Sequence, residues 1–131
     1  MRQYLAASPF ARKLGLEVID LAPDRAHLRL PYDPSLATVG TIVHGGALGT
    51  LADTAATAAC WTAVDVHAVT TGATISLTID YMTAAAETTV DAAAAVVRRG
   101  RSICFAEVRL TNQAGEPVAQ ALATYRFALA A

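Results

Sequence analysis

Charged and aromatic residues are both scarce in this chain of 131 residues. Aspartate, glutamate, lysine and arginine make up 16% of the sequence, and phenylalanine, tryptophan and tyrosine make up 6%. The formal net charge of -1 and the isoelectric point near 6.3 provide no general attraction for nucleic acid or for an anionic membrane. The composition therefore argues against nucleic acid as a partner.

Cysteine is also rare, since the chain contains only Cys60 and Cys104. The two residues form no Cys-x-x-Cys pair, and no histidines accompany them at the spacing of a metal site. We expect two buried free thiols rather than a disulfide or a zinc site, and no bound metal.

The sequence lacks a long apolar run. No segment reaches the ~20 charge-free apolar residues of a transmembrane helix. The N-terminal segment Met1–Pro9 lacks the apolar stretch of a signal peptide. These absences predict a soluble cytoplasmic protein with no membrane partner.

Apolar residues are abundant by contrast, at 54% of the chain. So much apolar surface exceeds what one small core can bury, and we therefore expect a homo-oligomer that buries part of it between subunits. No repeat, low-complexity linker or charge block divides the sequence. We expect one domain spanning residues 1–131.

The spacing of apolar residues predicts an α+β fold. Ser8–Leu14 has the capping serine, early proline and late cations of a short helix, and Leu16–Leu30 alternates as a hairpin around Pro23 and Asp24. Gly45–Ala63 is the only long helical pattern. Alternating or β-branched strands follow at 66–82, 88–99, 101–111 and 117–129. One helix followed by long strands predicts an antiparallel sheet wrapped on that helix.

Asp53 is the one acid inside the long apolar helix. A carboxylate there is costly unless it has a partner or a function. On a helical wheel it shares a face with small residues at Gly49, Ala56, Thr57 and Cys60, which would allow a substrate or a second subunit to approach. The alternative from the residues alone is a structural ion pair between Asp53 and an arginine.

The segment His44-Gly45-Gly46 stands at the predicted start of this helix. Free amides and the positive end of the helix dipole stabilise an anion or a developing oxyanion, and glycines leave the backbone open to a ligand. The alternative is a simple turn into the helix with a hydrogen-bonded structural histidine.

The motif His44–Gly46, followed by Leu51–Ala55, resembles the signature of the hotdog-fold acyl-CoA thioesterases. The likeness is to the PaaI-type branch of the 4-hydroxybenzoyl-CoA thioesterase superfamily. It continues in Gly72–Met82, Arg98–Ser102 and Ala121–Phe127. The resemblance implies a hotdog fold, edge-to-edge dimers that often pair into tetramers, and active sites at the dimer interface. One subunit would supply the glycines and its partner the acid.

The resemblance also implies residue roles. The Gly45 amide would polarise the thioester carbonyl, while Gly46 would keep the approach open. Asp53 would attack the carbonyl or activate a water molecule. Thr74 would position that water, unless it is an ordinary strand threonine, and His44 would hold the loop in place rather than exchange protons.

A basic cluster, Arg98, Arg99, Arg101 and Ser102, would contact the phosphates of coenzyme A, unless it is only a solvated turn. The substrate would be an aromatic or medium-chain acyl-CoA, with no cofactor besides the coenzyme A that it carries. Many relatives have an asparagine shortly before the histidine, and 37–43 contains none, although Thr38 or Thr41 could replace part of its contact. We expect slower turnover or a different acyl group as the consequence.

Two other functions are compatible with the same fold. A hydratase or dehydratase would use His44 and Asp53 for proton transfer at an enoyl thioester, although such enzymes usually place these residues in a different motif. A non-catalytic acyl-CoA sensor would need a DNA-binding extension. The glycines directly after His44 favour hydrolysis.

Overall fold

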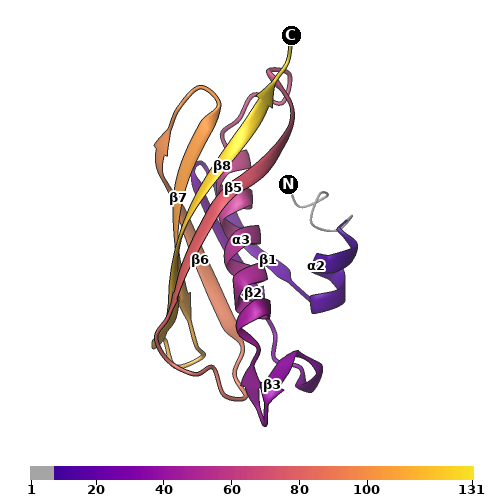
Figure 1. The fold of residues 1–131 in the computed structure, drawn as a ribbon, viewed down its shortest axis with the longest axis vertical. Coiled ribbons are helices and arrows are strands. Elements are labelled where there is room, and N and C mark those ends of the chain that lie inside the picture. Colours follow the sequence, from indigo (N-terminus) through magenta and orange to yellow (C-terminus); the bar gives the residue numbers. More distant parts are fainter. Residues whose placement is uncertain (1–7) are drawn as a thin grey trace.

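An antiparallel sheet runs along one side of a single long helix (Figure 1). The computed structural model describes residues 8–131, and Met1–Ala7, most of the segment without a signal-peptide pattern, lies outside the described residues. The predicted α+β arrangement is confirmed.

The helices are α2 (Pro9–Leu14) and α3 (Gly45–Trp61), with a short 3-10 turn, η1 (Pro34–Leu36). The strands are β1 (Glu17–Ala22), β2 (Arg25–Leu30), β3 (Ala37–Val39), β4 (Ile42–Val43), β5 (Val69–Tyr81), β6 (Val90–Arg99), β7 (Ile103–Thr111) and β8 (Pro117–Leu129). The predicted helices and strands are all present, with ends shifted by a few residues. The small β3–β4 pair is an additional feature.

The main sheet has six strands in the order β1-β2-β6-β7-β8-β5, and all neighbours are antiparallel. Strand β5 therefore lies at one edge and pairs with β8 alone among the described strands. An edge strand of 13 residues exposes a long row of backbone donors and acceptors, which is suited to pairing with another chain.

The core lies between α3 and the inner face of the sheet, where α3 packs mainly on β2, β6 and β7. Four leucines are fully buried there: Leu28, Leu30, Leu51 and Leu110. Burial of each contributes ~1.5–3 kcal/mol relative to exposure. Cys60 and Cys104 are buried in this core as free thiols, as expected.

Helix α3 begins and ends at side-chain hydrogen bonds. His44 is the N-cap, and its ring Nδ1 accepts a hydrogen bond from the Gly46 amide at 2.7 Å. At the other end the Thr62 hydroxyl donates to the Ala59 carbonyl at 2.6 Å and accepts from the Asp24 amide at 2.8 Å. The helix is thus held to the sheet at its C-terminus by the β1–β2 turn.

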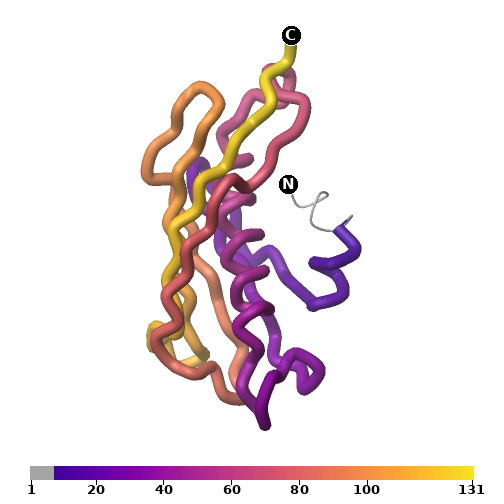
Figure 2. The backbone as a smooth tube through the Cα atoms, in the orientation of Figure 1, coloured from indigo at the N-terminus to yellow at the C-terminus, as the bar shows by residue number. Residues whose placement is uncertain are grey.

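The β3–β4 hairpin fixes the chain directly before α3. It lies at the end of the molecule opposite to the C-terminus (Figure 2). The Val43 amide donates to the Ala85 carbonyl at 2.9 Å, and the His44 amide donates to the Leu36 carbonyl at 2.7 Å. These backbone bonds anchor the entry to the helix on both sides.

The outer face of the sheet, turned away from α3, carries several exposed apolar side chains. Val97 is 63% exposed, Leu122 62% and Ile75 57%. Within residues 8–131, no helix is both long enough and apolar enough to cross a bilayer. Some of the abundant apolar residues are therefore exposed on the surface of the single chain. Such residues are available for contact with another subunit.

Candidate active site

Asp53 and Thr74 meet between the middle of α3 and the middle of β5. The Thr74 hydroxyl donates a hydrogen bond to Asp53 Oδ1 at 2.7 Å, and both residues are half-buried. The register of β5 with β8 shifts between Thr74 and Ser76, the kind of local irregularity that re-aims side chains beside active sites. In residues 8–131 Asp53 forms no ion pair, so the arginine alternative is wrong within this chain.

The two glycines at the start of α3 differ in their hydrogen bonding. The Gly46 amide is occupied by His44 Nδ1, which acts as the acceptor, so a neutral His44 ring carries its proton on Nε2. In the described part of the chain the Gly45 amide has no acceptor. Gly45 therefore presents the free donor at the positive end of the helix dipole.

Gly46 has little room for a side chain. A Cβ at Gly46 would lie 2.9 Å from His44 Nδ1, whereas a Cβ at Gly45 would lie 3.4 Å from the nearest atoms of the Tyr81 ring. A side chain at position 46 would therefore force the His44 ring to shift, and the histidine cap favours glycine there. At position 45 the absent side chain leaves the amide accessible.

A groove of about 290 Å³ runs beside Gly45. Its walls are mostly apolar and come from the end of β5, the loop after it, the β3–β4 hairpin and the first turn of α3, including Thr38, Leu48, Tyr81 and Met82. Tyr81 contacts Gly45 directly, because its hydroxyl donates to the Gly45 carbonyl at 2.7 Å. Thr38 lines this groove, and Thr41 does not.

Gly45 and Asp53 are not brought together within one chain. They are eight positions apart on α3, and a rise of 1.5 Å per residue separates them by about 12 Å along the helix axis. A carbonyl bound at the Gly45 amide is therefore beyond the reach of Asp53 in the same chain.

Comparison with known proteins identifies the family to which this arrangement belongs. Residues 40–119 match the Thioesterase superfamily, a segment that contains the His-Gly-Gly motif, Asp53 and Thr74. The chain belongs to this superfamily. A Halobacterium salinarum protein named as a candidate esterase is 35% identical over 104 residues, which cover 77% of this chain and 68% of the relative.

Solved structures agree with this assignment. A thioesterase family protein from Silicibacter pomeroyi has a TM-score of 0.91 and 25% identity, with 98% of this chain and 96% of that chain covered. A variant of the phenylacetic acid degradation protein PaaI from Thermus thermophilus has a TM-score of 0.81 and 29% identity, with 93% and 100% covered. The protein is a thioester hydrolase with the hotdog fold, of the PaaI type.

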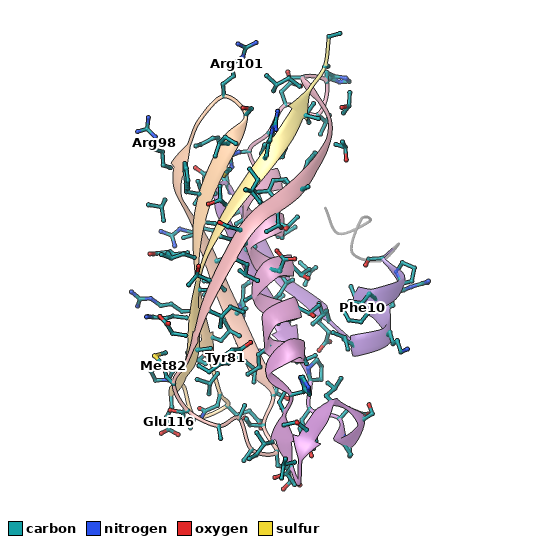
Figure 3. All side chains as sticks on the ribbon, viewed as in Figure 1. Phe10, Tyr81, Met82, Arg98, Arg101 and Glu116 are labelled. Carbon is teal, nitrogen blue, oxygen red and sulfur yellow. The ribbon has the colours of Figure 1, made fainter. Side chains whose placement is uncertain are left out.

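The basic cluster of this thioesterase lies far from its own helix N-terminus. Arg98 and Arg101 stand at the β6–β7 connection, at the opposite end of the molecule from Tyr81 and Met82 (Figure 3). Both are exposed and form no ion pair among the described residues. They remain candidates for contact with an anionic substrate group.

Arg99 differs from its two neighbours. Its Nη2 donates to Asp24 Oδ1 at 2.8 Å, and its side chain is only 24% exposed. Arg99 thus joins β6 to the β1–β2 turn, a structural contact that sequence reasoning did not anticipate. Ser102, also in the predicted cluster, accepts a hydrogen bond at its carbonyl from the Phe127 amide at 2.7 Å.

The helix face around Asp53 is narrower than predicted. Gly49 and Thr57 are half-buried like Asp53, but Ala56 is 2% exposed and Cys60 is fully buried. The expectation that these last two share an open face is wrong, because the sheet curls around more of the alanine-rich helix than a single apolar stripe would cover.

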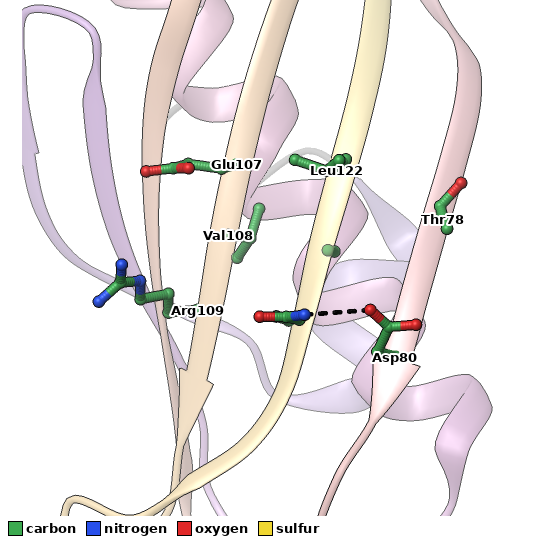
Figure 4. Close-up of a pocket in the computed structure, with 8 residues that line it drawn as sticks. Thr78, Asp80, Glu107, Val108, Arg109 and Leu122 are labelled. Atoms are coloured by element: carbon green, nitrogen blue, oxygen red, sulfur yellow. Dashed lines mark hydrogen bonds between the residues drawn. The ribbon is translucent and has the colours of Figure 1, made fainter.

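A second hollow, of about 200 Å³, lies on the outer face of the sheet (Figure 4). It is lined by side chains such as Asp80, Glu107 and Arg109, and the Gln120 amide donates to Asp80 Oδ2 at 3.1 Å. Exposed Glu107 and Arg109 alternate with buried Val108, which faces α3. The whole thickness of the sheet therefore separates this hollow from Asp53, and it takes no part in the candidate site.

Proposed function

We propose that this thioesterase hydrolyses acyl-CoA to a free acid and coenzyme A, at a site that two subunits share. The observation that carries the proposal is the pairing of Asp53 with Thr74, about 12 Å along the helix from a free Gly45 amide. Both halves of a hydrolytic site are present, and a second copy of the chain is needed to unite them.

In the proposed reaction the thioester carbonyl oxygen accepts a hydrogen bond from the Gly45 amide of one subunit. Asp53 of the other subunit accepts a proton from water as the hydroxide oxygen bonds to the carbonyl carbon. The resulting oxyanion is stabilised by the Gly45 amide and the helix dipole. When the carbon–sulfur bond breaks, the thiolate leaves and takes up the proton from Asp53.

The Thr74 hydroxyl supports the general-base role over direct attack. Its proton is donated to Asp53 Oδ1, so its lone pairs can accept a hydrogen bond from the attacking water. Oδ2 of Asp53 is left to receive the proton. One water can therefore be held by two side chains that are already hydrogen-bonded to each other.

A dimer through the free edge of β5 would complete the site. Antiparallel pairing of two β5 strands about a two-fold axis reverses the direction of the partner's α3. The N-terminus of one helix then approaches the middle of the other helix, where Asp53 lies. The long exposed edge of β5 and the half-buried face at Gly49, Asp53 and Thr57 support this arrangement. Two such dimers would form the tetramer.

The same arrangement of two subunits is compatible with a coenzyme A site at Arg98 and Arg101. These residues lie near the C-terminal end of their own α3, and reversal of the partner places its Gly45 on the same side of the molecule, closer to them than their own Gly45 is. Free guanidinium groups are suited to phosphate oxygens. Arg99 would contribute less to phosphate binding, because its guanidinium already forms an ion pair with Asp24.

The groove beside Gly45 supports an apolar acyl group, either aromatic or of medium length. Thr38, which lines it, has a hydroxyl with fewer donors than an amide, so it can replace only part of the contact that an asparagine makes in many relatives. The expected consequence is a lower turnover than an asparagine would allow.

The test is release of coenzyme A, followed with a thiol reagent, from acetyl-, hexanoyl-, decanoyl- and phenylacetyl-CoA. The wild type should release thiol from at least one of them, and Asp53→Asn should lower kcat by at least 100-fold, because the base is removed without a change of shape. Glu107→Gln makes the same carboxylate-to-amide change on the outer face of β7, away from the candidate site, and is the matched control that should retain activity. Full activity of Asp53→Asn would refute the proposal.

A further inference from the structure

We propose that Tyr81 is a positioning and specificity-determining residue of this site: its hydroxyl fixes the Gly45 turn, and its ring limits the acyl group. The inference rests on the proposed function and deepens it. It is drawn from contacts between the end of β5 and the first turn of α3, two segments that are far apart in the sequence.

The hydroxyl acts on the peptide that follows Gly45. Tyr81 donates to the Gly45 carbonyl at 2.7 Å, and the amide of the same peptide, on Gly46, donates to His44 Nδ1 at 2.7 Å. Both polar atoms of this peptide unit are therefore held by side chains. Rotation of the unit would break two hydrogen bonds.

The peptide that precedes Gly45 is held by backbone bonds. The His44 carbonyl accepts from the amides of Ala47 at 2.9 Å and Leu48 at 3.2 Å. The Gly45 amide belongs to this unit, and its direction is set by the two peptides together. Because glycine has few steric restrictions, the hydrogen bond from Tyr81 adds a constraint at a residue that has no side chain of its own to limit the backbone. Donors aligned before the reaction avoid reorganisation when the oxyanion forms.

The ring of Tyr81 forms a wall of the groove that starts at Gly45. Ring atoms lie 3.4 Å from the place that a Gly45 Cβ would occupy, and the hydroxyl lies 3.6 Å from that of Gly49. Tyr81 is nevertheless 55% exposed, so one face remains open to a ligand. An acyl group next to the Gly45 amide would lie against this ring.

The backbone at Tyr81 is rigid enough for this role. Tyr81 is the last residue of β5 and lies opposite Ala119 of β8. The Met82 and Thr83 amides both donate to the Val118 carbonyl, at 2.9 and 3.2 Å. The ring is therefore supported by the sheet rather than by a loose loop.

Two variants distinguish the role of the Tyr81 hydroxyl from the role of its ring. Tyr81→Phe removes only the hydrogen bond to Gly45, and kcat should fall by about tenfold for every acyl-CoA tested, with KM little changed. Tyr81→Ala also removes the wall. It should raise kcat/KM for decanoyl-CoA relative to hexanoyl-CoA by about tenfold or more, because added room favours the larger group.

Tyr125→Phe is the matched control. Its hydroxyl accepts a hydrogen bond from Trp61 Nε1 at the other end of α3, and its side chain is buried away from the groove. This variant should keep the wild-type decanoyl-to-hexanoyl ratio of kcat/KM. Retention of wild-type kcat by Tyr81→Phe would overturn the positioning half of the proposal. Retention of the wild-type decanoyl-to-hexanoyl ratio of kcat/KM by Tyr81→Ala would overturn the specificity half.

Amide hydrogen exchange measured by NMR makes the positioning role testable without turnover. Tyr81→Phe should accelerate exchange at Gly46 by about tenfold and leave Ala55, in the middle of α3, unchanged. Unchanged exchange at Gly46 would overturn the positioning role even in an active enzyme. Absence of thiol release from the wild type would instead refute the proposed function, while the exchange result would still decide whether Tyr81 holds the turn.

Discussion

The Thr74 hydroxyl and the Asp53 carboxylate are joined by a 2.7 Å hydrogen bond between β5 and α3. The acid in the apolar helix is thus solvated by a hydroxyl rather than neutralised by a cation. In residues 8–131 the other oxygen, Oδ2, has no hydrogen-bond partner, and such a carboxylate oxygen is suited to accept a proton. This contact is the structural basis for treating Asp53 as a base.

Replacement of Thr74 should affect turnover more than substrate binding. Thr74→Val keeps the shape and β-propensity of the side chain but removes the hydroxyl, and we expect kcat to fall by about tenfold, the effect of one lost hydrogen bond. Thr74→Ser keeps the hydroxyl and should retain most of the activity. Steady-state kinetics of both variants decide the matter, and equal losses in Thr74→Ser and Thr74→Val would show that packing matters instead.

His44 should tolerate replacement by another N-cap residue. Its ring Nδ1 accepts a hydrogen bond from the Gly46 amide at 2.7 Å. An asparagine side chain also accepts such hydrogen bonds well at helix N-termini. We expect His44→Asn to keep much of the wild-type kcat and His44→Ala to lose stability by about 1 kcal/mol in urea unfolding. If both variants are equally inactive while folded, His44 takes part in proton transfer.

The long elements were predictable because their patterns are strong. The alanine- and leucine-rich run that starts at Gly45 predicted α3 to within two residues of its end at Trp61. The β3–β4 hairpin was not predicted, since its strands are very short and depend on a long-range bond from Val43 to Ala85. Local patterns carry no information on such contacts.

The candidate site was predictable in part. The resemblance implied that Thr74 positions the water on which Asp53 acts, and the structure places the two side chains in hydrogen-bond contact. The contact of Tyr81 with Gly45 and the ion pair of Arg99 with Asp24 join residues that are 36 and 75 positions apart. Only the folded chain shows that Arg99 forms an ion pair, whereas Arg98 and Arg101 form none in residues 8–131.

The basic cluster should recognise the nucleotide part of the substrate. We expect the double variant Arg98→Ala/Arg101→Ala to raise KM for acyl-CoA by about tenfold through loss of charge-assisted contacts. Its KM for the corresponding N-acetylcysteamine thioester, which lacks the nucleotide, should stay unchanged. Arg109→Ala, at the outer face of β7, is the control. An equal rise of KM for both thioesters would contradict a phosphate site.

Acid should weaken the fold through Asp91. The Arg29 guanidinium donates to both Asp91 oxygens, at 2.7 and 3.1 Å, and with His27 it holds the pKa of Asp91 below its usual range. The ionised form is favoured by folding, so this contribution is complete above the unfolded pKa, about 3.9, and is lost as pH falls through the lower folded pKa. Asp91→Asn should therefore be less stable than wild type at neutral pH, and the difference should shrink in strong acid.

Urea unfolding at several pH values measures this difference. Asp80→Asn is a suitable comparison, because Asp80 is exposed and forms no ion pair in residues 8–131. A stability gap between wild type and Asp91→Asn that does not change with pH would show that the ion pair with Arg29 is not its source.

The most direct test of the shared site mixes two inactive subunits. Gly45→Pro removes the amide donor at a helix position that favours proline, and Asp53→Asn removes the base. If each site takes Gly45 from one subunit and Asp53 from the other, co-expression of both variants should restore about a quarter of wild-type thiol release, because half of the two-fold dimers are mixed and each has one intact site. Activity of the mixture no higher than that of either variant alone would contradict the account.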